Sequence, residues 1–171
     1  ETGLLLGQQV EVTYLLSQAD PIPATTVRLL AEEISAENKL LISILHSMTL
    51  EEKVAQMFFV RCPAEYADQT VLKWQIGGFI LFGRDFSGKT PDQLRQNIAD
   101  YQQNAKTPLF IGADEEGGEV VRASLYSQFR PVSFPSPQDL YAQGGLDSVL
   151  EDAKDKSSFL LDLGINVNLA P

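Results

Sequence analysis

An acidic cluster follows directly on an apolar run near the middle of the chain. The run Leu-Phe-Ile-Gly-Ala ends in Asp114, and two more carboxylates, Glu115 and Glu116, come next. Bulky, β-favouring residues without polar interruption predict a buried parallel strand that delivers these acids to a site. The glycines that follow, Gly117 and Gly118, allow a sharp turn or the close approach of a ligand. We therefore expect a functional site beside Asp114, with all three carboxylates as initial candidates for catalysis.

A second segment carries the pattern of a phosphate-binding loop. Residues Gly83–Thr90 match G-x-x-x-x-G-K-[ST], between an expected strand and an expected helix. Pro91 weakens this interpretation, because such a loop aims consecutive backbone N–H groups at phosphates and proline has no N–H. Proline also moves Thr90 away from helical dihedral angles, so Thr90 fits a helix N-cap better. Nucleotide hydrolysis by a P-loop at Gly83–Thr90 remains an alternative function.

The elements that position these residues alternate between strands and helices. Strands are expected at 57–60, 77–82, 108–114 and 165–169. Helices are expected to begin near Leu50 after the capping box Thr49–Glu52, at Pro91 after Thr90, and over 146–162. This alternation predicts βα units and a parallel sheet. The pattern alone does not choose between an open doubly wound sheet and a closed barrel.

The N-terminal region differs from the rest of the chain. Alternating residues over Val10–Leu16 predict a short strand, and from about Thr26 the apolar residues through Leu45 follow helical spacing. We expect residues 1–40 to form an extension and residues 41–171 to form the main domain.

Composition narrows the possible functions. The 171 residues are 44% hydrophobic, which suits a globular domain, and carry a formal charge of −10. That charge argues against nucleic acid or an anionic membrane as the main partner. No apolar run approaches the ~20 residues that span a bilayer. A single histidine, His46, excludes a histidine-rich metal site, and a single cysteine, Cys62, excludes an internal disulfide.

Several motifs, in this order, resemble the N-terminal domain of family-three glycoside hydrolases. They are Met48–Met57, Gly77–Arg84, Ile111–Gly118, Phe134–Pro137 and Gly164–Pro171. The similarity covers about residues 41–171 and is greatest to the β-N-acetylhexosaminidase branch. It implies an α/β fold of the (β/α)8 TIM-barrel type, with its site at the C-terminal ends of the strands. It also implies a carbohydrate substrate and neither a metal nor an organic cofactor.

The resemblance implies that this chain is about half of a barrel. A barrel of this type needs about 250 residues. The family's later motifs, which supply the acid/base and the nucleophile of retaining hydrolysis, are absent from the sequence. We expect the parent enzyme to hydrolyse terminal β-N-acetylglucosaminides and this chain alone to be inactive. The missing C-terminal half, or a second copy across open barrel edges, is the expected partner. A non-catalytic interaction module remains a further alternative.

The resemblance also assigns roles at the site. It implies that Asp114 binds sugar hydroxyls, and pleating then places Gly112 on the same inward face. Arg122 is expected to hold one of the carboxylates and to belong to the substrate site. Arg84 is open to two interpretations, a contact at the rim of that site or a surface charge.

The neighbouring acids and glycines are expected to support the loop. Glu115, Glu116, Gly117 and Gly118 are assigned to this structural role. Glu119 and Asp85 depart from the Arg and Asn that the family usually has there, so the local charge network is expected to differ. Elsewhere, Trp74 is expected in the core, not as a platform for sugar.

Overall fold

The computed structural model describes residues 9–14, 24–30 and 36–170. The chain divides into two compact units, residues 1–48 and residues 49–171. The second unit contains the acidic cluster. The predicted boundary between residues 40 and 41 stays a prediction, and helix α1 (Ala36–Ser47) spans it.

The first unit contains a strand pair and helix α1. Strand β1 (Gln9–Tyr14) pairs antiparallel with β2 (Ala24–Leu30). The β1 strand was predicted, whereas the helix expected from about Thr26 is wrong over the residues of β2. The β-branched run Thr25-Thr26-Val27 favours a strand, and pairing with β1 supplies backbone partners that the helical spacing of Val27 and Leu30 did not reveal.

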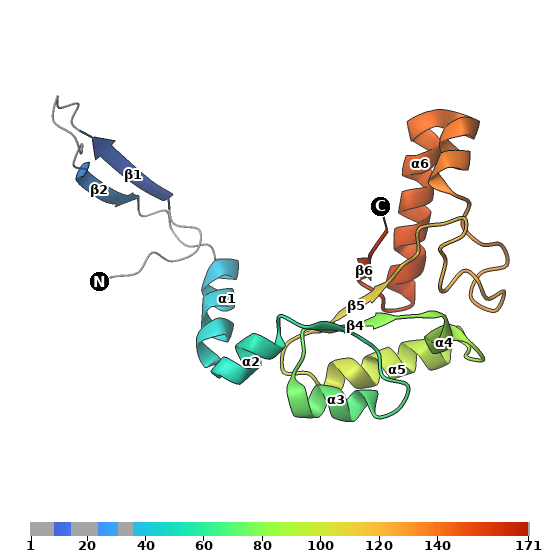
Figure 1. Cartoon of the computed structure of the whole chain (residues 1–171), viewed down its shortest axis with the longest axis horizontal. Coiled ribbons are helices and arrows are strands. Elements are labelled where there is room, and N and C mark those ends of the chain that lie inside the picture. Colours follow the sequence, from blue (N-terminus) through green and yellow to red (C-terminus); the bar gives the residue numbers. More distant parts are fainter. Residues whose placement is uncertain (1–8, 15–23, 31–35, 171) are drawn as a thin grey trace. The chain divides into compact units, whose positions relative to one another are not determined.

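The second unit is built on a parallel four-stranded sheet. Its strands follow one another in the order β3-β4-β5-β6, and all their pairings are parallel. Figure 1 labels β4, β5 and β6 of this sheet. The four strands are β3 (Phe59–Arg61), β4 (Gly78–Leu81), β5 (Phe110–Ala113) and β6 (Val167–Asn168). The four predicted strands are therefore confirmed, each shorter than its apolar segment. Sequential order with helical crossovers is the arrangement expected for part of a (β/α)8 barrel.

One helix precedes these strands and the others connect them. The helices are α2 (Leu50–Ala55), α3 (Ala67–Trp74), α4 (Gly83–Phe86), α5 (Pro91–Asn104) and α6 (Pro137–Asp162). The predicted caps are confirmed: Thr49 Oγ1 and Thr90 Oγ1 each accept the backbone N–H three residues later, at 3.2 Å. Helix α6 begins earlier than the predicted 146–162. Ser136 caps it, and non-helical dihedral angles at Gly144 and Gly145 break it near the expected start.

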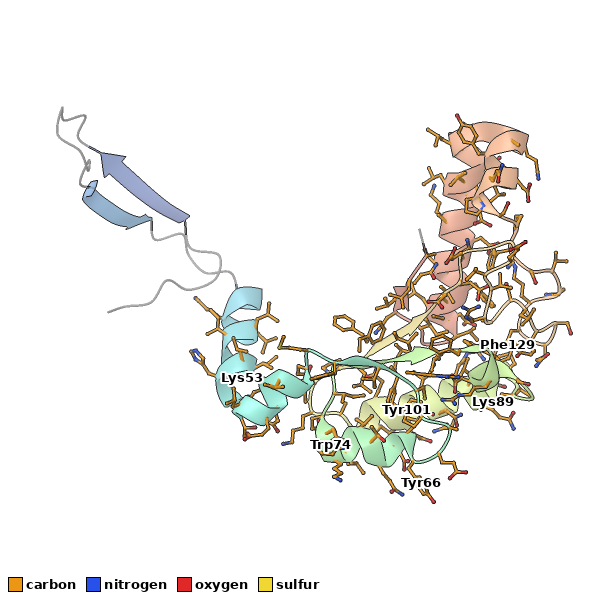
Figure 2. All side chains as sticks on the ribbon, viewed as in Figure 1. Lys53, Tyr66, Trp74, Lys89, Tyr101 and Phe129 are labelled. Atoms are coloured by element: carbon orange, nitrogen blue, oxygen red, sulfur yellow. The ribbon has the colours of Figure 1, made fainter. Side chains whose placement is uncertain are left out.

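The two faces of the sheet have different environments. Phe79 and Ile111 point to the helices and are fully buried in the core. Phe79 packs edge-on against Tyr101 of α5, which Figure 2 labels beneath the sheet. On the opposite face Phe110 is 60% exposed and contacts Phe59 edge-on. This confirms the predicted pleat, and Gly112 leaves the space that the Phe59 ring occupies, since a Cβ there would lie 2.5 Å from its Cζ.

Trp74 is not in the core, contrary to the prediction. It ends α3 with 58% of its surface exposed, beside Lys73, whose ammonium lies 4.6 Å from the ring centroid. The helix turns its buried side, Ala67 and Val71, toward the sheet, and this leaves Trp74 outside. None of the helices in the described ranges is long and apolar enough to cross a membrane.

Candidate functional site

Three neighbouring strands bring side chains together at their carboxyl ends. Arg61 ends β3, Phe82 follows β4 and Asp114 follows β5. The register pairs Arg61 with Ile80 and Ile80 with Gly112, so pleating puts Arg61, Phe82 and Asp114 on the face opposite the helices. The guanidinium carbon of Arg61 lies 4.9 Å from the centroid of the Phe82 ring. This is the edge of the sheet at which barrel enzymes place their sites.

Asp114 is bound to Arg122. The arginine Nη2 donates to Asp114 Oδ2 at 2.9 Å, and both side chains remain about one-quarter exposed, at 25% for Arg122 and 23% for Asp114. The Arg122 guanidinium also lies 5.8 Å from the Phe82 ring centroid. Asp114 is thus fixed through one oxygen yet still reachable from solvent.

Glu115 points the other way, into the protein. Its side chain is fully buried, and Oε2 accepts the backbone N–H groups of Arg122 at 3.0 Å and of Ala123 at 2.8 Å. Oε1 accepts the hydroxyl of Ser124. A buried carboxylate with this many hydrogen-bond donors is stable, and it anchors the segment that carries Arg122. It is not open to a substrate.

The next residues form a tight turn. Glu116 N–H donates to the Val120 carbonyl at 2.9 Å, and Gly118 N–H donates to the Phe134 carbonyl at 2.9 Å. Gly117 has a φ of +100°. A Cβ at Gly117 would lie 2.2 Å from the Pro135 carbonyl oxygen, so a side chain fits neither the backbone conformation nor the space.

Two residues that sequence reasoning missed hold this loop from other elements. In β6, Asn168 accepts the Glu115 N–H and donates to the Glu115 carbonyl, both at 3.0 Å. In α6, Lys156 donates to the Glu116 carbonyl at 2.8 Å. Asn168 lies in the quoted motif Gly164–Pro171 and alternates with apolar neighbours, a signal that could have singled it out. Lys156 gives no such signal, because a lysine on a helix is usually solvated.

Arg84 contacts residues other than Asp114 and Arg122. Its Nη2 donates to the Cys62 carbonyl, and its Nε is 3.8 Å from Asp85 Oδ1. Asp85 is only 8% exposed, and its carboxylate accepts a hydrogen bond from the Phe82 N–H at 2.8 Å. Arg84 therefore ties the end of β4 to the end of β3, whereas Asp85 binds the end of β4 alone, and 41% of the Arg84 side chain stays exposed.

The residues of the phosphate-loop pattern are engaged locally. Lys89 Nζ donates to the Asp85 carbonyl at 2.8 Å, and Thr90 Oγ1 caps α5. Thr90 therefore acts as the helix cap that Pro91 indicated.

The cysteine and the acidic residues of the described chain add neither a reactive thiol nor a metal site. Burial, with the negative charge of Asp85, raises the pKa of the nearby Cys62 thiol to about 11, so the thiol is protonated and a poor nucleophile at neutral pH. Among the described residues there is no cluster of His, Cys, Asp and Glu that could hold a metal.

Comparison with known proteins decides the family. The model of the glycosyl hydrolase family 3 N terminal domain matches residues 49–171. The chain belongs to glycosyl hydrolase family 3. The resemblance and the α/β fold expected from the sequence are thereby confirmed. The parallel sheet of residues 49–171 is part of the TIM-barrel-like domain of family 3.

Relatives within family 3 include β-N-acetylglucosaminidases. A β-N-acetylglucosaminidase from Paenibacillus sp. strain FPU-7 superposes with a TM-score of 0.63 at 30% identity, over 73% of this chain and 24% of that protein. A family 3 glycosyl hydrolase from Mycobacterium smegmatis gives a TM-score of 0.62 at 28% identity, over 74% of this chain and 37% of that protein. β-Hexosaminidase A of Pseudoalteromonas piscicida is 29% identical in an alignment 113 residues long, which covers 60% of this chain and 18% of that protein.

This family 3 chain thus spans a minor part of each relative, between 18% and 37% of its length. The Asp114–Arg122 pair, with the loop that carries it, lies inside the matched region.

Proposed function

We propose that this chain supplies the Asp114 side of the active site of a retaining β-glycosidase that removes terminal N-acetylglucosamine residues. The observation that carries the proposal is Asp114 itself, presented at the carboxyl end of β5 and bound by Arg122 through Oδ2 alone among the described residues. A carboxylate held in this way can accept hydrogen bonds from two sugar hydroxyls, and such charge-assisted bonds are strong. The names of the Paenibacillus and Pseudoalteromonas relatives support the choice of sugar.

Arg122 and Arg84 have different parts in this proposal. Arg122 orients Asp114 and lines the sugar site, where its partly exposed guanidinium can donate to a hydroxyl. Arg84 is a rim contact through the exposed part of its side chain. Glu115, Glu116, Gly117 and Gly118 support the loop. No metal or organic cofactor is part of the proposal.

The bond-breaking groups are proposed to come from outside this half of the barrel. Retaining hydrolysis needs a nucleophile and an acid/base on the two sides of the glycosidic bond. Asp114 is assigned here to binding sugar hydroxyls, and Glu115 is fully buried, so the proposal places neither carboxylate at the anomeric carbon. The C-terminal half of a barrel, or a second copy of this chain, would cover the sheet edges at β3 and β6. We expect no turnover by the 171-residue chain alone.

The test uses a family 3 protein that carries this chain within a complete barrel. Asp114→Asn should lower kcat/KM for 4-nitrophenyl β-N-acetylglucosaminide by at least about a hundredfold, since two charged hydrogen bonds of about 1.5–3 kcal/mol each are weakened. Asp68→Asn, at an exposed position on α3, is the matched control and should leave kcat/KM unchanged. Full activity in Asp114→Asn would exclude the assigned site. Turnover by the purified 171-residue chain would disprove its expected inactivity.

A further inference from the structure

Lys156 is a buried cation that faces the acidic loop. Only 7% of the residue is exposed. Its Nζ lies 3.0 Å from Asp152 Oδ2 one helical turn earlier, and 5.2 Å from the centroid of the Phe134 ring. A buried ammonium is unfavourable unless it is paired and hydrogen-bonded. Here the remaining partner is the Glu116 carbonyl at 2.8 Å, which belongs to the loop and not to the helix.

The hydrogen bond from Lys156 belongs to a network of hydrogen bonds that holds the loop after Asp114. Asn168 holds the backbone of Glu115 in both directions, and Lys156 holds the backbone of the next residue, Glu116. The Glu115 side chain then binds the backbone at Arg122, whose guanidinium returns to Asp114. The two residues after Asp114 are thus fixed by one side chain from β6 and one from α6. The direction of the Asp114 side chain depends on this backbone.

We infer that Lys156 is a positioning residue for the sugar-binding pair Asp114–Arg122, an inference that rests on the proposed function. Lys156 acts through its hydrogen bond to the Glu116 carbonyl, and the ion pair with Asp152 compensates the positive charge of the buried ammonium. A binding carboxylate must be held within a fraction of an ångström of its productive position, so a loosened loop lowers binding and rate together.

Stability alone does not explain this buried pair. Replacing both members of a buried ion pair by apolar side chains is often neutral or even stabilising, whereas removing one member leaves an unpaired charge. The double variant Lys156→Met/Asp152→Leu therefore removes the hold on the loop without leaving a buried charge. It remains informative where Lys156→Met alone unfolds the protein. Lys154→Met, two residues away at an exposed position of α6, is the matched control.

The first measurement uses the 171-residue chain and needs no activity. Amide hydrogen exchange at Gly117 and Gly118, which donate to the Val120 and Phe134 carbonyls, reports whether the loop is held. In the double variant we expect both amides to exchange at least about tenfold faster at an unchanged urea midpoint. Lys154→Met should leave both rates unchanged. Unchanged exchange in the double variant would overturn the inference.

The second measurement uses the complete-barrel protein and the same chromogenic substrate. The double variant should lower kcat/KM at least about tenfold, and in its background Asp114→Asn should cost less than it does alone, because the two changes act on one arrangement. Strict additivity with Asp114→Asn would count against positioning. An Asp114→Asn protein with full activity removes the proposed function instead, and exchange at Gly117 and Gly118 then still decides whether Lys156 holds the loop.

Discussion

At the scale of residues, neighbouring carboxylates have opposite environments. Asp114 and Glu115 are adjacent, yet one is partly exposed on an arginine and the other is completely buried. Adjacent side chains at a strand end point to opposite faces, so one faces the sheet's open side and the other the core. Chemical type alone did not separate their environments. The family resemblance suggested the division of roles, which stays a prediction.

Glu115→Gln is expected to lower the free energy of unfolding by about 1–3 kcal/mol. The amide keeps one acceptor but turns an NH2 group toward the N–H donors of residues 122 and 123 or the Ser124 hydroxyl. Urea unfolding measures the change. Glu119→Gln, at an exposed position in the same loop, should have an effect within about 0.5 kcal/mol. Equal midpoints for the two variants would contradict the role given to the buried carboxylate.

At the scale of elements, close packing of strands depends on glycine. Gly78 of β4 lies against Phe110 of β5, and a Cβ there would lie 2.1 Å from the Phe110 carbonyl oxygen. Backbone atoms on both sides of this contact are held in the sheet, so neither strand can move away without losing ladder hydrogen bonds. The register of the two strands therefore requires glycine at this position.

Gly78→Ala is expected to destabilise the protein by about 1–3 kcal/mol or more, the range for overpacking in a closely packed interior. The matched control is Gly83→Ala at the start of α4, where a Cβ would lie 3.4 Å from the Tyr126 hydroxyl, an ordinary contact. Urea or thermal unfolding of the two variants makes the comparison. The packing argument fails if Gly78→Ala is as stable as Gly83→Ala.

At the scale of the whole molecule, the core cluster formed by the described residues lies in one unit. All buried residues of the described core lie between Cys62 and Ile165, within residues 49–171. The family match covers the same residues. The stability of the parallel sheet is therefore expected to depend on this unit.

Residues 49–171 alone are expected to fold and to unfold at the same urea midpoint as the 171-residue chain. Their core, helix caps and loop contacts are all internal to the unit. Circular dichroism during urea titration of the two proteins makes the comparison. A clearly lower midpoint for 49–171 would show that residues 1–48 contribute to the core.

The sequence alone was enough to predict the four strands of the parallel sheet, the caps at Thr49 and Thr90, and Asp114 as the acid at a strand end. These features depend on local chemistry: β-favouring runs, side-chain oxygens three residues before a free N–H, and glycine after acid. The tertiary structure decided the strand at Ala24–Leu30, the exposure of Trp74 and the contacts of Asn168 and Lys156 with the loop. Each of these depends on a partner distant in the chain or on burial against other elements. A local sequence pattern cannot specify such partners, so the contacts from Asn168 and Lys156 that hold the loop after Asp114 could not be predicted from the sequence.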